Sequence, residues 1–420
     1  MSIETHRLSN GLTLVAERMP GLESSTVGVW VKAGARNEDA AQNGIAHFLE
    51  HMAFKGTTAR SALEIAEVIE DVGGFINAYT SREMTAYYTR VLGADVPLAL
   101  DVLADILRDS TFDPREIEIE RGVILSEIGQ SLDTPDDVIF DWLQGVSYPD
   151  QPMGRPILGP AKNVKRFSRQ DLSGFVATHY GAENLVVSVA GMVDFGALVS
   201  QVEALFGDMP KSAAPMAEAA QFVGGEKREE KDLEQAHFTL GFAAPGIRDA
   251  QIYTAQIYSM LLGGGMTSRL FQEAREKRGL CYSIFASITP GLENGMLSIY
   301  AGTSGDQISE LADVTIAEMK RATDDISEAE LARAQVQMKA GMLMGLESPS
   351  ARAERMARAI GIWGHVPPLS DAVKKIEAVS VQGLKDYAAS VCESAEMAMA
   401  LYGPVAGAPA LEELHAGLRR

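Results

Sequence analysis

The sequence has few of the features that would place it among secreted, membrane or nucleic-acid-binding proteins. It contains only two cysteines, Cys281 and Cys392, and no CxxC motif, so disulfides are not expected and the cytoplasm is the expected compartment. No apolar run approaches the ~18 to 20 residues of a membrane span, and the charged start MSIETHRLSNG lacks the apolar block of a signal peptide. The net charge of −20 argues against nucleic acid and favours basic partners, although acidic surfaces also serve solubility alone.

The chain is long enough for more than one domain. Its 420 residues, 46% of them hydrophobic, exceed the length at which single cores usually stop growing. A polar stretch rich in Ala, Pro and Gly separates two halves whose helix and strand patterns follow the same order. We therefore expect an α+β fold of two similar, duplicated domains, each a mostly antiparallel sheet packed with helices. The expected boundaries are 1–210, a linker at 211–231, and 232–420.

The segment NGIAHFLEHMAFKG carries two of the seven histidines four residues apart. On a helix, His47, Glu50 and His51 project from one face, and two imidazoles one turn apart can chelate one ion. Zinc suits this arrangement, and Glu50 is placed to take a proton from a zinc-held water. The alternative is a helix with incidental histidines, but HxxEH would arise by chance in fewer than about two such sequences in a hundred. The matching helix of the second half has no histidine.

A third ligand should be a carboxylate on a separate element. In DPREIEIERGVILSEIGQ, Glu120 and Glu127 lie two helical turns apart on one face, and the apolar residues between them predict that this helix packs inward. A buried glutamate needs a partner, and for Glu127 a metal ion would supply the counter-charge.

Taken together and in order, these segments resemble the pitrilysin-type family of inverted zincin metallopeptidases, closest to the mitochondrial processing peptidase β-subunit and its bacterial homologues. The resemblance spans almost the whole chain and rests on HFLEHMAFKGT, a glutamate 76 positions after the second histidine, GGFINAYTSRE, DQPMGRPILGP and SRLFQEAREKRGLCYS. It implies one zinc ion per chain held by His47, His51 and Glu127. It also implies that Glu50 is the general base, that Glu120 is a second carboxylate of the site, and that the two domains form half of a clamshell.

The resemblance further implies how a peptide substrate is held. An edge strand could pair its free backbone groups with an extended substrate, although alternation alone fits an interior strand equally well. The residues that the family uses in this way match Asn77, Ala78, Tyr79, Thr80 and Ser81.

In the second half, Arg275 and Tyr282 match a pair that these peptidases bring to the substrate carbonyl, where both can donate to a developing oxyanion. On residue type alone, Arg275 fits a solvated basic face. Because the chain carries both the zinc motif and this pair, we expect a homodimer in which the pair of one chain faces the zinc of the other.

Asp137 and Asp141 match acidic residues that the family uses to bind an arginine of the substrate just before the cleavage point. The alternative is a solvated acidic face.

The expected function is therefore a zinc-dependent endopeptidase that hydrolyses extended, basic, presequence-like peptides. Two other functions stay open: a non-catalytic structural homologue of the respiratory-complex core-subunit type, and a peptide-binding protein without turnover. An intact zinc motif weighs against the first, and a Glu50→Gln variant separates the second, because only a peptidase depends on that carboxylate.

Overall fold

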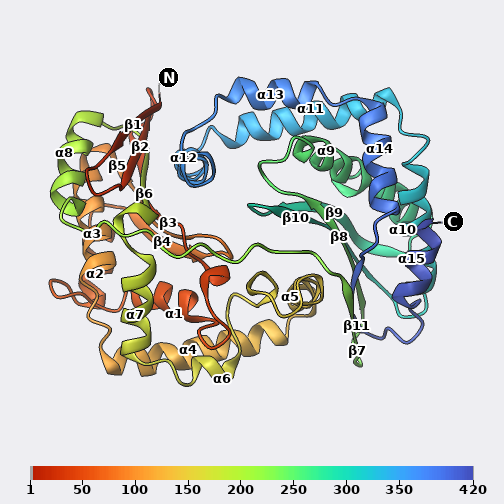
Figure 1. Ribbon diagram of the computed structural model, residues 1–420, viewed down its shortest axis with the longest axis horizontal. Helices are drawn as coiled ribbons and strands as arrows, with labels where there is room; N and C mark the ends of the chain where they lie inside the picture. The colour runs from red at the N-terminus through yellow and green to blue at the C-terminus, as the bar shows by residue number, and fades with distance from the viewer. Residues whose placement is uncertain (1–2, 420) are drawn as a thin grey trace. The chain divides into compact units, whose positions relative to one another are not determined.

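The computed structural model describes residues 3–419, which form two compact units (Figure 1). Each unit contains one β-sheet and one main hydrophobic core. Within the described residues, no helix is both long and apolar enough to span a membrane. Of the described residues, unit 1 comprises 3–129, Arg155–Glu218 and Leu343–Pro367, and unit 2 comprises Gln130–Gly154, Ala219–Met342 and 368–419.

The sheet of unit 1 has six strands in the order β1-β2-β6-β3-β5-β4, and only the pair β2 and β6 is parallel. Successive side chains of a strand point to opposite faces, so Val29 lies in the main core whereas Trp30 lies on the other face. The strands are β1 (Ile3–Arg7), β2 (Thr13–Arg18), β3 (Ser24–Val31), β4 (Phe75–Thr80), β5 (Thr85–Leu92) and β6 (Leu185–Gly191).

Helices cover both faces of this sheet. The main core receives apolar side chains from α1, α2, α3, α4, α7 and α8, and the opposite face is covered by α12, which contacts β2, β3 and β6. The helices of unit 1 are α1 (Ile45–Met52), α2 (Ala62–Glu70), α3 (Val96–Arg108), α4 (Pro114–Leu132), α6 (Ala161–Val164), α7 (Arg169–His179), α8 (Phe195–Phe206) and α12 (Pro349–Trp363).

Unit 2 repeats this plan with five strands in the order β7-β11-β8-β10-β9, of which only β7 and β11 pair in parallel. One face carries the main core, and α5 covers the other. The strands are β7 (Gly225–Glu230), β8 (Ala236–Pro245), β9 (Cys281–Pro290), β10 (Asn294–Thr303) and β11 (Ala398–Gly403). The helices are α5 (Pro135–Ser147), α9 (Ile252–Gly263), a π-helix (Phe271–Glu276), α10 (Ile308–Arg321), α11 (Glu328–Gly345), α13 (Leu369–Glu377), α14 (Val381–Cys392) and α15 (Leu411–Arg419).

The two similar units, each a mostly antiparallel sheet packed with helices, confirm the expected α+β fold. Their boundaries differ from the expected continuous ranges 1–210 and 232–420. Each half of the sequence contributes one helix to the other half's sheet: α5 packs on β8 and β11 of unit 2, and α12 packs among the elements of unit 1 (Figure 1). The stretch 211–231 also differs from a simple linker, since it contains β7 and the buried Phe222.

Candidate metal centre

The site is built on α1, a helix whose start is fixed by a buried carboxylate. Gly44 precedes the helix with φ at 101°, a left-handed conformation, and a side chain there would collide with the Leu158 carbonyl oxygen at 2.8 Å. Glu38, only 2% exposed, caps the helix instead: it accepts the Gly44 N–H at 2.9 Å and the Ala46 N–H at 2.8 Å. Burial raises the pKa of Glu38 to about 7, despite these hydrogen bonds and a further one from Asn43.

The rest of α1 follows from its apolar spacing. Ile45, Phe48, Leu49 and Met52 are buried in the main core of unit 1, which leaves the histidines on the other side of the helix. In α4, Ile117, Glu120 and Ile124 are the buried residues, so this helix packs inward as expected and its Glu127 lies one turn beyond Ile124.

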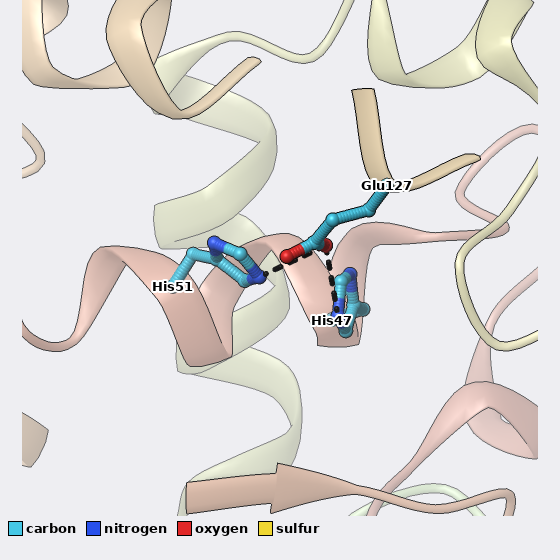
Figure 2. Close-up of side chains that lie close together, drawn as sticks. All are labelled: His47, His51 and Glu127. Atoms are coloured by element: carbon cyan, nitrogen blue, oxygen red, sulfur yellow. Dashed lines mark ion pairs between the residues drawn. The ribbon is translucent and has the colours of Figure 1, made fainter. Parts of the chain in front are cut away.

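The structure brings together the three residues that the sequence pointed to as ligands. Figure 2 shows His47 and His51, both from α1, pointing toward the carboxylate of Glu127 from α4. The Glu127 Oε2 atom lies 3.4 Å from His51 Nε2 and 3.8 Å from His47 Nε2. One ligand atom from each residue lies within 4.8 Å of the others, and within residues 3–419 no other group of three such side chains meets this criterion.

This cluster has the chemistry of a zinc site. Ligand atoms about 2.0–2.2 Å from a tetrahedral zinc ion lie roughly 3.3–3.6 Å apart, a range that already includes the His51–Glu127 distance of 3.4 Å. Within the described part of the chain, Glu127 Oε2 and His47 Nδ1 are inaccessible to solvent and have no hydrogen-bond partner. Buried polar atoms are rarely left unpaired, so an ion at Glu127 would account for its oxygen. Burial, and next to it the neighbouring His51, lowers the pKa of His47 to about 4, so this ring stays neutral and can bind a metal.

Glu120, expected as a second carboxylate of the site, contacts a ligand rather than the cluster centre. Its Oε2 lies 2.9 Å from Nδ1 of His51, the ring atom opposite the one near Glu127, and its Oε1 lies 2.6 Å from Nζ of Lys55. Carboxylates commonly orient metal-binding histidines in this way. Sequence reasoning missed Lys55, although its position four residues after His51 is a signal that could have pointed to it.

Glu50, the expected general base, is held by Thr80. The Thr80 hydroxyl donates to Glu50 Oε2 at 2.6 Å. Burial raises the pKa of Glu50, and the hydrogen bond from Thr80 opposes this shift because it favours the ionised carboxylate. The side chain of Thr80 thus lies on the base, and the expected contact of its backbone with substrate stays a prediction.

The expected substrate strand is β4, which lies at the edge of the unit 1 sheet and not in its interior. Its residues Asn77, Ala78 and Tyr79 pair with β5 on one side. The Tyr79 hydroxyl donates to Glu354 of α12 at 3.2 Å. Ser81 follows the strand in a turn, where its N–H donates to the Met84 carbonyl oxygen at 2.8 Å. A substrate role for these residues stays a prediction.

Arg275 and Tyr282 lie together in unit 2. The Arg275 guanidinium carbon is 5.1 Å from the centre of the Tyr282 ring and 4.5 Å from that of Phe271, on the same π-helix. Tyr282 is 80% exposed, which leaves its hydroxyl available to a ligand. Phe271 was not among the expected site residues.

Asp137 and Asp141 lie one turn apart on α5 of unit 2, as expected. Asp137 is exposed and accepts a hydrogen bond from the Ser131 hydroxyl at 3.2 Å. Asp141 is half-buried. The geometry within α5 allows both the substrate-binding and the solvated-face interpretation.

Comparison with known proteins identifies the family of this chain. Residues 13–161 match the family described as "Insulinase (Peptidase family M16)", and residues 166–338 match the "Peptidase M16 inactive domain", in keeping with the lack of histidine in α9. An uncharacterized zinc protease of Rickettsia felis is 40% identical over 86% of this chain and 88% of its own length. An uncharacterized zinc protease of Bacillus subtilis is 36% identical over 97% and 100%.

Two solved structures share the fold. A protease from Helicobacter pylori aligns with a TM-score of 0.89 at 23% identity over 95% of this chain and 99% of its own. A chain of complex III2 from Candida albicans, solved with Inz-5 bound, aligns with a TM-score of 0.88 at 20% identity over 99% and 100%. By its profile matches and its similarity to these relatives over almost its full length, the chain belongs to peptidase family M16.

Proposed function

We propose that this protein is a zinc-dependent endopeptidase. The observation that carries the proposal is the cluster of His47, His51 and Glu127, whose ligand atoms converge within 4.8 Å while Glu127 Oε2 is buried without a hydrogen-bond partner in the described chain. Three protein ligands with one position left for water are the arrangement of hydrolytic zinc sites. The names of the bacterial relatives, zinc proteases, support the same activity.

The residues of this chain divide the work of hydrolysis. Bound zinc supplies a Lewis acid that activates water and polarises a peptide carbonyl. Glu50 accepts the proton of the attacking water and passes it to the leaving amine, and Thr80 holds that carboxylate at 2.6 Å. Glu120 holds the ring of His51 through Nδ1 at 2.9 Å.

The substrate in this proposal is an extended peptide. The free edge of β4 would pair with its backbone without demanding a particular sequence, and Arg275 with Tyr282 would donate to the oxyanion that forms at the carbonyl. We take the enzyme to work in the cytoplasm as a homodimer. The zinc site of one chain and the Arg275 and Tyr282 pair of the other would then act on one peptide.

The acidic pair on α5 suggests the kind of peptide. Two like charges one turn apart are better accommodated beside a cation, and an arginine guanidinium can engage both carboxylates of Asp137 and Asp141. We therefore expect presequence-like, basic peptides with an arginine two residues before the scissile bond. The Asp137→Asn, Asp141→Asn double variant should lose this preference and still cleave neutral peptides. Equal kcat/KM of the wild-type enzyme for arginine-containing and alanine-substituted peptides would contradict it.

The second candidate is a non-catalytic role as a subunit of a larger complex. The fold does not distinguish this role from that of a peptidase, because a protease and a chain of a larger complex both share it. The TM-scores to the Helicobacter pylori protease and to the complex III2 chain are 0.89 and 0.88. The complete set of His47, Glu50, His51 and Glu127 favours the peptidase. Peptide cleavage that is lost on chelation and restored by zinc would support it, and a protein that cleaves no peptide with zinc bound would favour the second candidate.

A further inference from the structure

Glu120 connects the metal cluster to a cation that lies outside it. The side chain of this glutamate is only 4% exposed, and both of its oxygens have partners. Its Oε2 lies 2.9 Å from His51 Nδ1, and its Oε1 lies 2.6 Å from the ammonium nitrogen of Lys55. Lys55 follows α1, which ends at Met52, so a histidine of the helix and a lysine just beyond it meet one carboxylate of α4.

The pairing with Glu120 determines which nitrogen of His51 can bind a metal. A carboxylate only accepts hydrogen bonds, so Nδ1 of His51 must carry the proton. The other ring nitrogen, Nε2, is then the one available to a metal, and it is this atom that lies 3.4 Å from Glu127 Oε2. The contact with Glu120 therefore holds the ring of His51 with Nε2 toward the cluster, the orientation that a zinc ligand requires.

The buried carboxylate of Glu120 has a cation 2.6 Å away, and burying a carboxylate without such a partner is costly. Lys55 supplies that cation and also fixes the direction in which Glu120 points. Building on the function proposed above, we propose that Lys55 is a positioning residue of the metal centre, acting on zinc through Glu120 and His51 without touching the ion.

The test is the zinc affinity of a Lys55→Met variant, measured at fixed pH by competition with a chromophoric chelator. Methionine is unbranched like lysine, one heavy atom shorter, and carries no charge. We expect binding weaker by roughly 10- to 100-fold, the usual effect of losing an outer partner of a metal-binding histidine. Lys339→Met is the matched control, since Lys339 pairs with Glu377 at 2.7 Å in unit 2, and it should bind zinc like the wild type.

A double variant separates positioning from a merely structural ion pair. If Lys55 acts through Glu120, Lys55→Met should cause no further loss of zinc affinity in a Glu120→Gln background. Should Lys55→Met fail to fold, as judged by melting of the metal-free protein, Lys55→Gln replaces it. The inference is overturned if wild-type protein binds zinc and the lysine variants bind it equally tightly, or if the two losses add. Wild-type protein that binds no zinc would instead overturn the proposed function itself.

Discussion

At the scale of single residues, the glutamates of α4 differ in what balances their charge. Glu118 is exposed and pairs with Arg121 at 3.0 Å, and Glu120 has Lys55 at 2.6 Å. Glu127 Oε2 instead lies 3.4 Å from His51 Nε2 and 3.8 Å from His47 Nε2. Burial lowers the pKa of His47, so its ring is neutral. Among these three glutamates, Glu127 is thus the one that meets histidines rather than a lysine or an arginine, which suits a metal ligand.

The first prediction concerns this carboxylate. A Glu127→Gln variant should bind zinc at least 10-fold more weakly and lose peptidase activity in parallel, because a neutral amide is a poor ligand for zinc. Metal analysis and a peptide-cleavage assay check the two effects together. Glu118→Gln, on the same helix but in an exposed ion pair, should leave both unchanged. Full zinc content and full turnover in Glu127→Gln would exclude it as a ligand.

The sequence predicts part of this site and not the rest, for a physical reason. His47 and His51 are one turn apart on one helix, so their meeting follows from helical geometry alone. The contacts of Lys55 with Glu120 and of Thr80 with Glu50 join separate elements, and they depend on how α4 joins the core of α1 and on how β4 packs against α1. The interchain role of Arg275 follows from resemblance rather than from any residue pattern.

At the scale of elements, the start of α1 depends on a carboxylate from outside the helix. Burial raises the pKa of Glu38 from the ordinary 4.5 to about 7. Between these two pH values the folded chain holds a proton that the unfolded chain releases. The contribution of Glu38 to stability is therefore greatest below pH 4.5 and is lost as the pH rises through about 7.

A Glu38→Gln variant makes this measurable. The free energy of unfolding of the wild type, relative to the variant, should fall as the pH rises from 5 to 8, by an amount on the order of 3 kcal/mol. Urea unfolding of the metal-free proteins checks it. In Glu118→Gln no such fall is expected, since Arg121 lowers the pKa of that exposed carboxyl. A pH-independent difference between wild type and Glu38→Gln would refute this account.

Helix α12, which the second half of the sequence contributes to unit 1, gives a second prediction at this scale. Met356 of α12 is fully buried against the unit 1 sheet, so Met356→Ala should destabilise unit 1 by about 2–5 kcal/mol. Hydrogen exchange should become faster in β3 and β6, although these strands lie far from residue 356 in sequence. Met344→Ala, at a residue 63% exposed, should have little effect. Unchanged exchange in β3 and β6 would mean that α12 contributes little to unit 1.

Most strands and helices could be predicted from alternation and helical spacing because those patterns are local. The exchange of α5 and α12 could not, since nothing in an amphipathic helix specifies which of two similar sheets it will cover. The strand β7 was missed because its sequence, GEKREE, is that of an exposed edge strand and has little apolar pattern.

At the scale of the whole molecule, the expected homodimer predicts complementation between inactive chains. A Glu50→Gln chain and an Arg275→Ala chain should each be inactive or nearly so. In a mixed dimer, one of the two sites would combine an intact Glu50 with an intact Arg275 if these residues act across chains. Peptide cleavage by isolated mixed dimers checks this, with the separate homodimers as controls. No recovery in the mixed dimers would mean that both residues act within one chain.

The central claim is that a zinc ion on His47, His51 and Glu127 works with Glu50 as the base. The most direct test measures zinc content and peptide cleavage of the wild type and of Glu50→Gln side by side. We predict one zinc per chain in both proteins, cleavage by the wild type, and a loss of at least about 100-fold in kcat for the variant, the usual effect of removing a general base. Equal cleavage by both proteins, or a wild-type chain without zinc that still cleaves peptides, would contradict the claim.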